Sequence, residues 1–188
     1  MVQPLNTLTE TASQTAGPYV HIGCTPNFVG IEGIYDEDLG LVPFPKDEPG
    51  EHITITGTIL DGTGTVLRDV LVESWQCNAE GTFGPGSRGF ARMPSDLTTG
   101  IWTLNTVKPA AVGKQSPHIA LWIVARGINI GLQTRIYFEG DDHSADPLLT
   151  RLEHQNRVET LIAKKTGDNS YQFDIRLQGE GETVFLDL

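Results

Sequence analysis

The chain is poor in cysteine, in positive charge and in long apolar stretches, and each shortage excludes a class of protein. Its 188 residues contain 2 cysteines, Cys24 and Cys77, which form neither a disulfide framework nor a C-x-x-C metal knuckle. A formal net charge of −11 leaves no basic stripe for a phosphate backbone, so we expect no nucleic-acid partner. No run approaches the roughly 18 apolar residues of a membrane span, so we expect no membrane partner.

The N-terminal segment, MVQPLNTLTETASQTAGPYV, lacks the apolar run that is typical of a secretory signal. With two cysteines that we expect to stay reduced, this predicts a cytoplasmic protein. The length predicts one domain, spanning 1–188, with room for a substantial core. The 21 glycines and 11 prolines favour an all-β architecture rich in turns.

Alternating apolar and polar residues predict a β-sandwich. Ile53, Ile55 and Ile59 alternate with threonines, which is the pattern of a half-buried strand, and a hairpin-type turn follows at 61–64. Short segments of this kind, separated by turn formers, are typical of a sandwich. The predicted strands span 53–59, 70–76, 101–107, 119–125, 132–138, 171–177 and 183–188.

One helix is predicted among these strands. Asp146 is a suitable N-cap and Pro147 fits the first helical position. Apolar residues then recur with a spacing near 3.6, as an amphipathic helix requires. They are Leu148, Leu149, Leu152, Val158, Leu161 and Ile162. Lys164 and Lys165 would lie in the last turn, and Gly167 would close the helix, which we expect to pack on the sandwich.

Residues 1–50 show little periodicity and many turn formers, although their composition is not of low complexity. They include apolar side chains, among them Ile22, Phe28 and Phe44, that would be costly to leave exposed to water. Long irregular segments in compact domains are usually functional. We therefore expect 1–50 to be an arm that wraps a partner, ahead of a sandwich core at 51–188; a floppy tail is the alternative.

Several segments, in this order, are similar to the intradiol ring-cleaving dioxygenases, and specifically to the α subunits of that family, which carry no iron. The similar segments are 15–20, 68–76, 106–109, 117–119, 125–130, 134–138 and 173–185. The resemblance covers nearly the whole chain and is weakest at about 24–48 and 79–99. It implies the β-sandwich of that family.

The resemblance also implies a heteromeric enzyme. In this family a homologous β subunit binds a non-haem Fe(III) through two tyrosinates and two histidines. Protocatechuate binds this iron through its two phenolic oxygens, and O2 cleaves the ring between the hydroxylated carbons to give a carboxymuconate. The subunits form αβ protomers that assemble into larger oligomers. We expect this chain to be inactive alone.

The positions that would carry the metal ligands hold unsuitable residues. The resemblance places the two tyrosines near Phe83 and within 110–112, which reads Ala-Ala-Val, and the two histidines at His118 and Ala120. One imidazole cannot hold Fe(III), which prefers anionic oxygens beside imidazole. The prediction is that this chain has no metal ligands and no catalytic residue, and that His118 is a satisfied interior histidine.

The resemblance implies four substrate-binding residues that reach the neighbouring β subunit's active site. Arg126, at a strand end before Gly127, would offer a permanent cation to an aromatic carboxylate. Gly17 and Pro18 would present a surface for the flat ring, and Thr15 a hydroxyl. The alternatives are an ordinary surface ion pair for Arg126 and an ordinary Gly-Pro turn.

Two other functions stay open on the sequence alone. One is a free-standing β-sandwich binding module that kept the fold without the metal chemistry, because one fold hosts many functions. The other, which is less favoured, is an independent metalloenzyme that uses His118 with unfamiliar ligands. The resemblance favours the subunit, because a module has no reason to keep both Arg126 and the Gly17-Pro18 segment.

Overall fold

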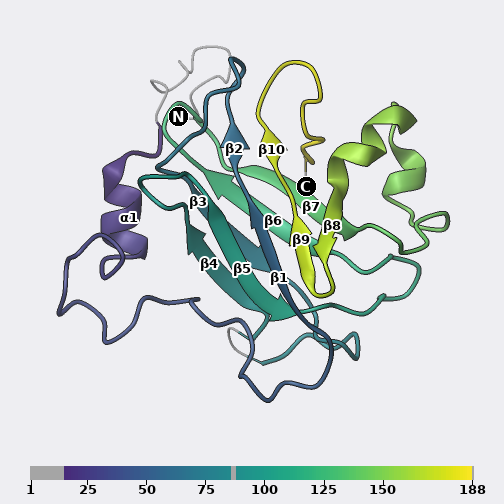
Figure 1. Cartoon of the computed structure of the whole chain (residues 1–188), viewed down its shortest axis with the longest axis horizontal. Coiled ribbons are helices and arrows are strands. Elements are labelled where there is room, and N and C mark those ends of the chain that lie inside the picture. The colour runs from purple at the N-terminus through teal and green to yellow at the C-terminus, as the bar shows by residue number, and fades with distance from the viewer. Residues whose placement is uncertain (1–14, 86–87, 188) are drawn as a thin grey trace, which may run out of the picture.

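The computed structural model describes residues 15–85 and 88–187 and arranges most of them in two packed layers of strands (Figure 1). In one layer the order is β4-β3-β6-β7, and in the other it is β8-β9-β1-β5. Two residue pairs between β7 and β8 join the layers, and β4 and β5 lie against each other at the opposite end. The bounds are β1 His52–Gly57, β3 Leu71–Trp75, β4 Phe90–Pro94, β5 Trp102–Val107, β6 Ile119–Val124, β7 Leu132–Phe138, β8 Ile162–Gly167 and β9 Ser170–Gln172.

The core lies between the two layers and consists of every second side chain of each strand. In β5, Trp102 and Leu104 are buried, while Thr103 and Asn105 are exposed. They face Ile119 and Ile123 of β6 across the core. A parallel pair, β2 (Ile59–Leu60) with β10 (Ile175–Arg176), extends the structure at one end. The predicted all-β sandwich is confirmed.

Most of the predicted strands are confirmed, with shifted bounds. The predicted strand at 171–177 is divided into β9 and β10, because the Asp174 carboxylate accepts hydrogen bonds from the backbone and the hydroxyl of Thr58. The sequence analysis missed β4, which has no β-branched residue and ends in Pro94. Pro94 is tolerated because β4 stands at one end of the strand order.

The predicted helix after Asp146 is wrong. Asp146 does cap a turn, since its Oδ1 accepts from the backbone N–H groups of Leu148 and Leu149 at 2.8 and 3.1 Å. Two 3₁₀ helices follow in place of one α-helix: η2 (Leu149–Arg151) and η3 (Gln155–Leu161). The segment 162–167 then forms β8, which pairs with β7 and β9. Tertiary pairing therefore overrides the apolar periodicity.

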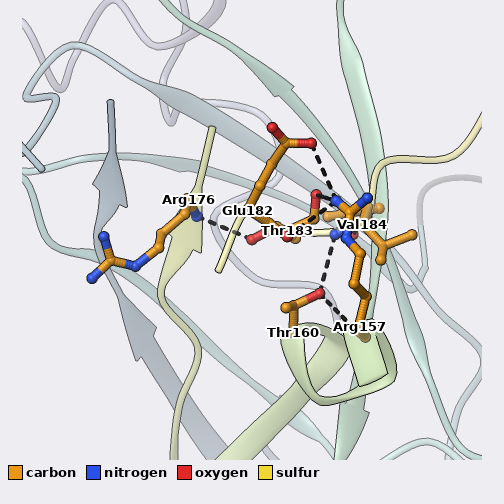
Figure 2. Close-up of polar contacts among 7 residues, drawn as sticks. Arg157, Thr160, Arg176, Glu182, Thr183 and Val184 are labelled. Atoms are coloured by element: carbon orange, nitrogen blue, oxygen red, sulfur yellow. Dashed lines mark hydrogen bonds and ion pairs between the residues drawn. The ribbon is translucent and has the colours of Figure 1, made fainter. Parts of the chain in front are cut away.

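The predicted strand at 183–188 is also wrong for the described residues, which end at 187. Single backbone hydrogen bonds, from the Thr183 N–H to the Arg176 carbonyl and from the Leu186 N–H to the Gln133 carbonyl, hold this segment together with side chains (Figure 2). Arg157 Nη2 donates to the carbonyl and the carboxylate of Glu182, at 3.2 and 3.1 Å. Thr160 Oγ1 accepts from the Val184 N–H at 3.1 Å, and Thr183 Oγ1 accepts from the Arg176 N–H at 3.0 Å.

The predicted N-terminal arm is irregular apart from one short helix, α1 (Pro18–Cys24). The arm follows β4: the Arg92 N–H donates to the Gly40 carbonyl at 2.8 Å, and the Arg92 guanidinium donates to the Cys24 carbonyl at 3.1 Å. These contacts protect a sheet edge from pairing with other chains. Residues 1–14 of the predicted arm lie outside the described residues. Among the described residues, no helix combines the length and the hydropathy that crossing a membrane would take.

Gly57 gives a test of the layer packing. A Cβ atom at this position would collide with the Phe173 carbonyl and lie 2.9 Å from the Trp102 ring. We expect Gly57→Ala to lower the free energy of unfolding by about 1–3 kcal/mol, because backbone must move to admit the methyl group. Denaturant unfolding measures this change.

Gly23→Ala in α1 is the matched control. A Cβ at Gly23 meets nothing within 4 Å and would favour the helix slightly. Equal stabilities of the two variants would contradict the packing described for Gly57.

Candidate functional site

The structure brings Thr15 to the loop that contains Arg126. The Gly127 N–H donates to Thr15 Oγ1 at 2.7 Å, and that hydroxyl lies 3.3 Å from the Ala125 carbonyl, to which it can donate. Thr15 therefore bonds the residues on either side of Arg126, although more than 100 positions separate them in the sequence. This contact docks the beginning of the described arm onto the end of β6.

Arg126 follows β6 by two residues, at a turn where Gly127 has a φ of +87°, a conformation that favours glycine. Its guanidinium Nη2 pairs with Asp69 Oδ2 at 2.8 Å, and 68% of its side chain is exposed. The surface ion pair considered for Arg126 is therefore present. An exposed pair contributes about 0–1 kcal/mol, so it can orient the guanidinium and still give way to another carboxylate.

Gly17 and Pro18 form the beginning of α1, next along the chain from Thr15. Gly17 is the N-cap, with extended backbone angles, and Pro18 is the first residue of the helix. A Cβ atom on Gly17 would meet nothing within 4 Å, so one side of this backbone is open. The Val20 N–H donates to the Gly17 carbonyl at 3.0 Å. Thr15, Gly17 and Pro18 therefore form one short segment that leads away from the Arg126 loop.

His118 lies apart from this segment and is a satisfied interior histidine, as predicted. Its Nδ1 donates to the Ser116 carbonyl at 2.8 Å, and its ring packs on Tyr137 with centroids 5.7 Å apart. Burial lowers the pKa of His118 below its usual value, so the ring is neutral near pH 7.

The positions that the resemblance assigns to metal ligands do not fit a non-haem iron. Phe83 stacks on Trp75, with centroids 6.2 Å apart, and offers no oxygen. Ala120 pairs with Trp75 on one side and with Arg135 on the other, so a cation stands beside it. Within 15–85 and 88–187, no group of three or more His, Cys, Asp or Glu side chains is placed to hold a metal ion.

Sequence reasoning missed Asp69, the partner of Arg126. Asp69 does lie in a segment that is similar to the family, since Arg68-Asp69 begins it. The sequence of a loop, however, gives no indication of which cation its carboxylate will pair with. It also missed the hydrogen bonds that Arg135 makes with Gln115 and Tyr137.

Comparison with known proteins identifies the family. A family model described as Dioxygenase matches residues 24–179. A protocatechuate 3,4-dioxygenase alpha chain from Pseudomonas putida is 42% identical over 98% of this chain and 99% of its own length. This chain belongs to the intradiol dioxygenase family.

Other dioxygenase relatives extend the comparison. An alpha chain from Burkholderia cepacia is 34% identical over 98% of this chain and all of its own length. A protocatechuate 3,4-dioxygenase beta chain from the same organism is 30% identical, over 80% of this chain and 75% of its own length. The similarity to alpha chains therefore spans the arm as well as the sandwich, whereas that to the beta chain is less complete.

Solved structures support the dioxygenase fold. The dioxygenase domain of a carbohydrate-binding fusion protein from Streptomyces sp. SirexAA-E superposes with a TM-score of 0.60 at 21% identity, covering 81% of this chain and 96% of its own. Catechol 1,2-dioxygenase from Pseudomonas arvilla C-1 gives 0.56 at 20% identity, covering 74% of this chain and 56% of its own. At these identities the likeness concerns the fold alone.

The docking of Thr15 predicts a change in amide exchange. Thr15→Val removes the acceptor of the Gly127 N–H, and we expect the protection of that amide to fall about tenfold, as for the loss of one hydrogen bond. Thr15→Ser keeps the hydroxyl and serves as the control. Hydrogen exchange followed by NMR measures both, and equal exchange in all three proteins would show that this contact does not hold the loop.

Proposed function

We propose that the chain is the non-iron alpha subunit of a protocatechuate 3,4-dioxygenase. One observation carries the proposal: the 42% identity to an alpha chain extends over 98% of the sequence, including the arm. The residues at the metal-ligand positions agree with it, because Phe83, Ala120 and the segment 110–112 offer iron no ligand. In this account the chain is a single domain of a cytoplasmic protein and has no activity alone.

The proposed reaction belongs to the complex. A homologous beta subunit carries the non-haem Fe(III), and the complex converts protocatechuate and O2 to 3-carboxy-cis,cis-muconate. Both subunits build the active site, and the αβ protomers assemble into a larger oligomer. No step of the reaction uses a metal bound to this chain.

The proposed contribution of this chain is to bind the substrate's carboxylate and ring. Arg126 suits a carboxylate because its guanidinium donates from a planar fork and keeps its charge at every relevant pH. Asp69 Oδ2 pairs with Nη2 of this guanidinium at 2.8 Å. Because the Arg126 side chain is largely exposed, its other N–H groups stay accessible to a ligand. The backbone at Gly17 and Pro18 is proposed to lie against the flat ring, and Thr15 fixes the loop from which Arg126 extends.

The arm is proposed to lie in the subunit interface. It exposes apolar side chains that a partner would cover: Ile34, Leu39, Leu41 and Val42. Exposed apolar side chains of this kind are typical of surfaces that a partner covers. No specific observation favours a free-standing binding module or an independent metalloenzyme based on His118.

Kinetics of an Arg126 variant test the proposal. In the complex with its beta subunit, Arg126→Gln should raise the KM for protocatechuate at least about tenfold, because a charge-assisted bond to the carboxylate is lost. Turnover of catechol, which has no carboxylate, should change little. Iron content should stay the same, because Arg126 is exposed and supplies no ligand to the iron in this account.

Arg68→Gln is the matched control, since it removes a neighbouring exposed cation without touching Arg126. A KM for protocatechuate that is the same in Arg126→Gln as in wild type would refute the role of Arg126. An equal rise of this KM in both variants would mean that the positive charge of the surface, and not a contact made by Arg126, is responsible.

A further inference from the structure

A second cationic group lies on β7, on the sheet face that turns away from the core. Arg135 pairs in register with Ala120 and is half-buried. Its Nη1 donates to Gln115 Oε1 at 3.0 Å and to the Tyr137 hydroxyl at 3.4 Å, while its Nε is buried without a hydrogen-bond partner among the described residues. No carboxylate of the described residues lies within ion-pair distance of this guanidinium. A partly buried cation without a counter-ion is costly, and an anionic ligand would remove that cost.

Asp146, the acid nearest to this network, is committed elsewhere. Its Oδ2 accepts from the Ser116 N–H at 2.8 Å, and its Oδ1 accepts from two backbone N–H groups of the turn that it caps. The Tyr137 hydroxyl, whose pKa burial raises to about 12, lies 3.4 Å from Oδ1 and stands between Asp146 and Arg135. Asp146 therefore accepts from uncharged donors, and no carboxylate of the described residues bonds Arg135 directly.

A pocket of about 360 Å³ opens beside Arg135, within the size range of small-molecule sites. It is lined by Gln115, Arg135, Pro147, Leu148, Arg151 and Leu152. Arg151 is exposed, and its side chain makes no hydrogen bond or ion pair with the described residues. Neither guanidinium group therefore has a carboxylate partner among the described residues. The leucines and the proline supply the apolar part of the lining.

We infer that this pocket binds a small organic carboxylate with an apolar or aromatic body. The two guanidinium groups and the Gln115 amide recognise the carboxylate, since guanidinium pairs with it through parallel N–H donors. Leu148, Leu152 and Pro147 cover the body of the ligand. The site is distinct from Arg126: Ala120, which pairs with Arg135, lies four positions or about 13 Å of strand before the end of β6, and Arg126 lies beyond that end and outside the pocket lining. The inference goes beyond the proposed function and does not depend on it.

Titration with 4-fluorobenzoate, followed by fluorine NMR, tests the inference on the full-length protein, together with any subunit that copurifies. We expect saturable binding that weakens at least about tenfold in Arg135→Gln, as for the loss of a charge-assisted bond. Arg151→Gln should weaken binding several-fold, and because Arg151 is exposed and unpaired in the described structure, this variant keeps the fold. Neutral 4-fluorobenzamide should not compete.

The titration is made in the Arg126→Gln background, so that the proposed substrate site does not contribute to the binding. Arg68→Gln, which removes an exposed cation outside the pocket lining, is the matched control and should leave the binding unchanged. Thermal unfolding of each variant separates loss of the site from loss of the fold. Absence of saturable binding to the wild-type protein would overturn the inference. So would binding that survives both pocket substitutions, or that disappears in Arg68→Gln, because the ligand would then occupy another site.

Discussion

Strand β6 is hydrogen-bonded on both sides, to β3 and to β7, and it buries Ile119, Leu121 and Ile123 in the core between the layers. This burial fixes the register of the strand, since a shift of one residue would turn its apolar side chains away from the core. Ala120 and Arg135 are thereby held on the opposite face. The same constraint places Arg126 just beyond the end of the strand, where Thr15 meets the loop. Both candidate binding sites therefore depend on the packing of one strand.

The sequence predicted the sandwich because alternation of apolar and polar residues is a local signal that directly reports which face is buried. The predicted helix is wrong for a physical reason. Leu149 and Leu161 are buried from two separate 3₁₀ helices, and the segment 162–167 pairs with β7 and β9 as a strand. The C-terminal segment alternates like a strand, yet it is held by the side chains of Arg157 and Thr160 (Figure 2). Such side-chain anchors leave no local pattern.

The candidate site was predictable only to the extent that it resembles a known family. The resemblance pointed to Thr15, Gly17, Pro18 and Arg126, and the structure adds that the Thr15 hydroxyl holds the Arg126 loop. The ion pair with Asp69 and the pocket around Arg135 join segments that are distant in the sequence, so only the fold reveals them. The two cationic sites differ in surroundings: Arg126 is exposed and paired, whereas Arg135 is half-buried and lacks a counter-ion in the described residues.

The central claim is that this chain completes an active site whose metal belongs to a partner. Iron content, measured on the full-length chain and on the complex that it forms with its beta subunit, tests this claim most directly. The account predicts no bound iron on the chain alone, and about one iron for each αβ pair in the complex, because metal affinity follows the available ligands. Stoichiometric iron on the isolated chain would contradict it and would make this chain an iron enzyme in its own right.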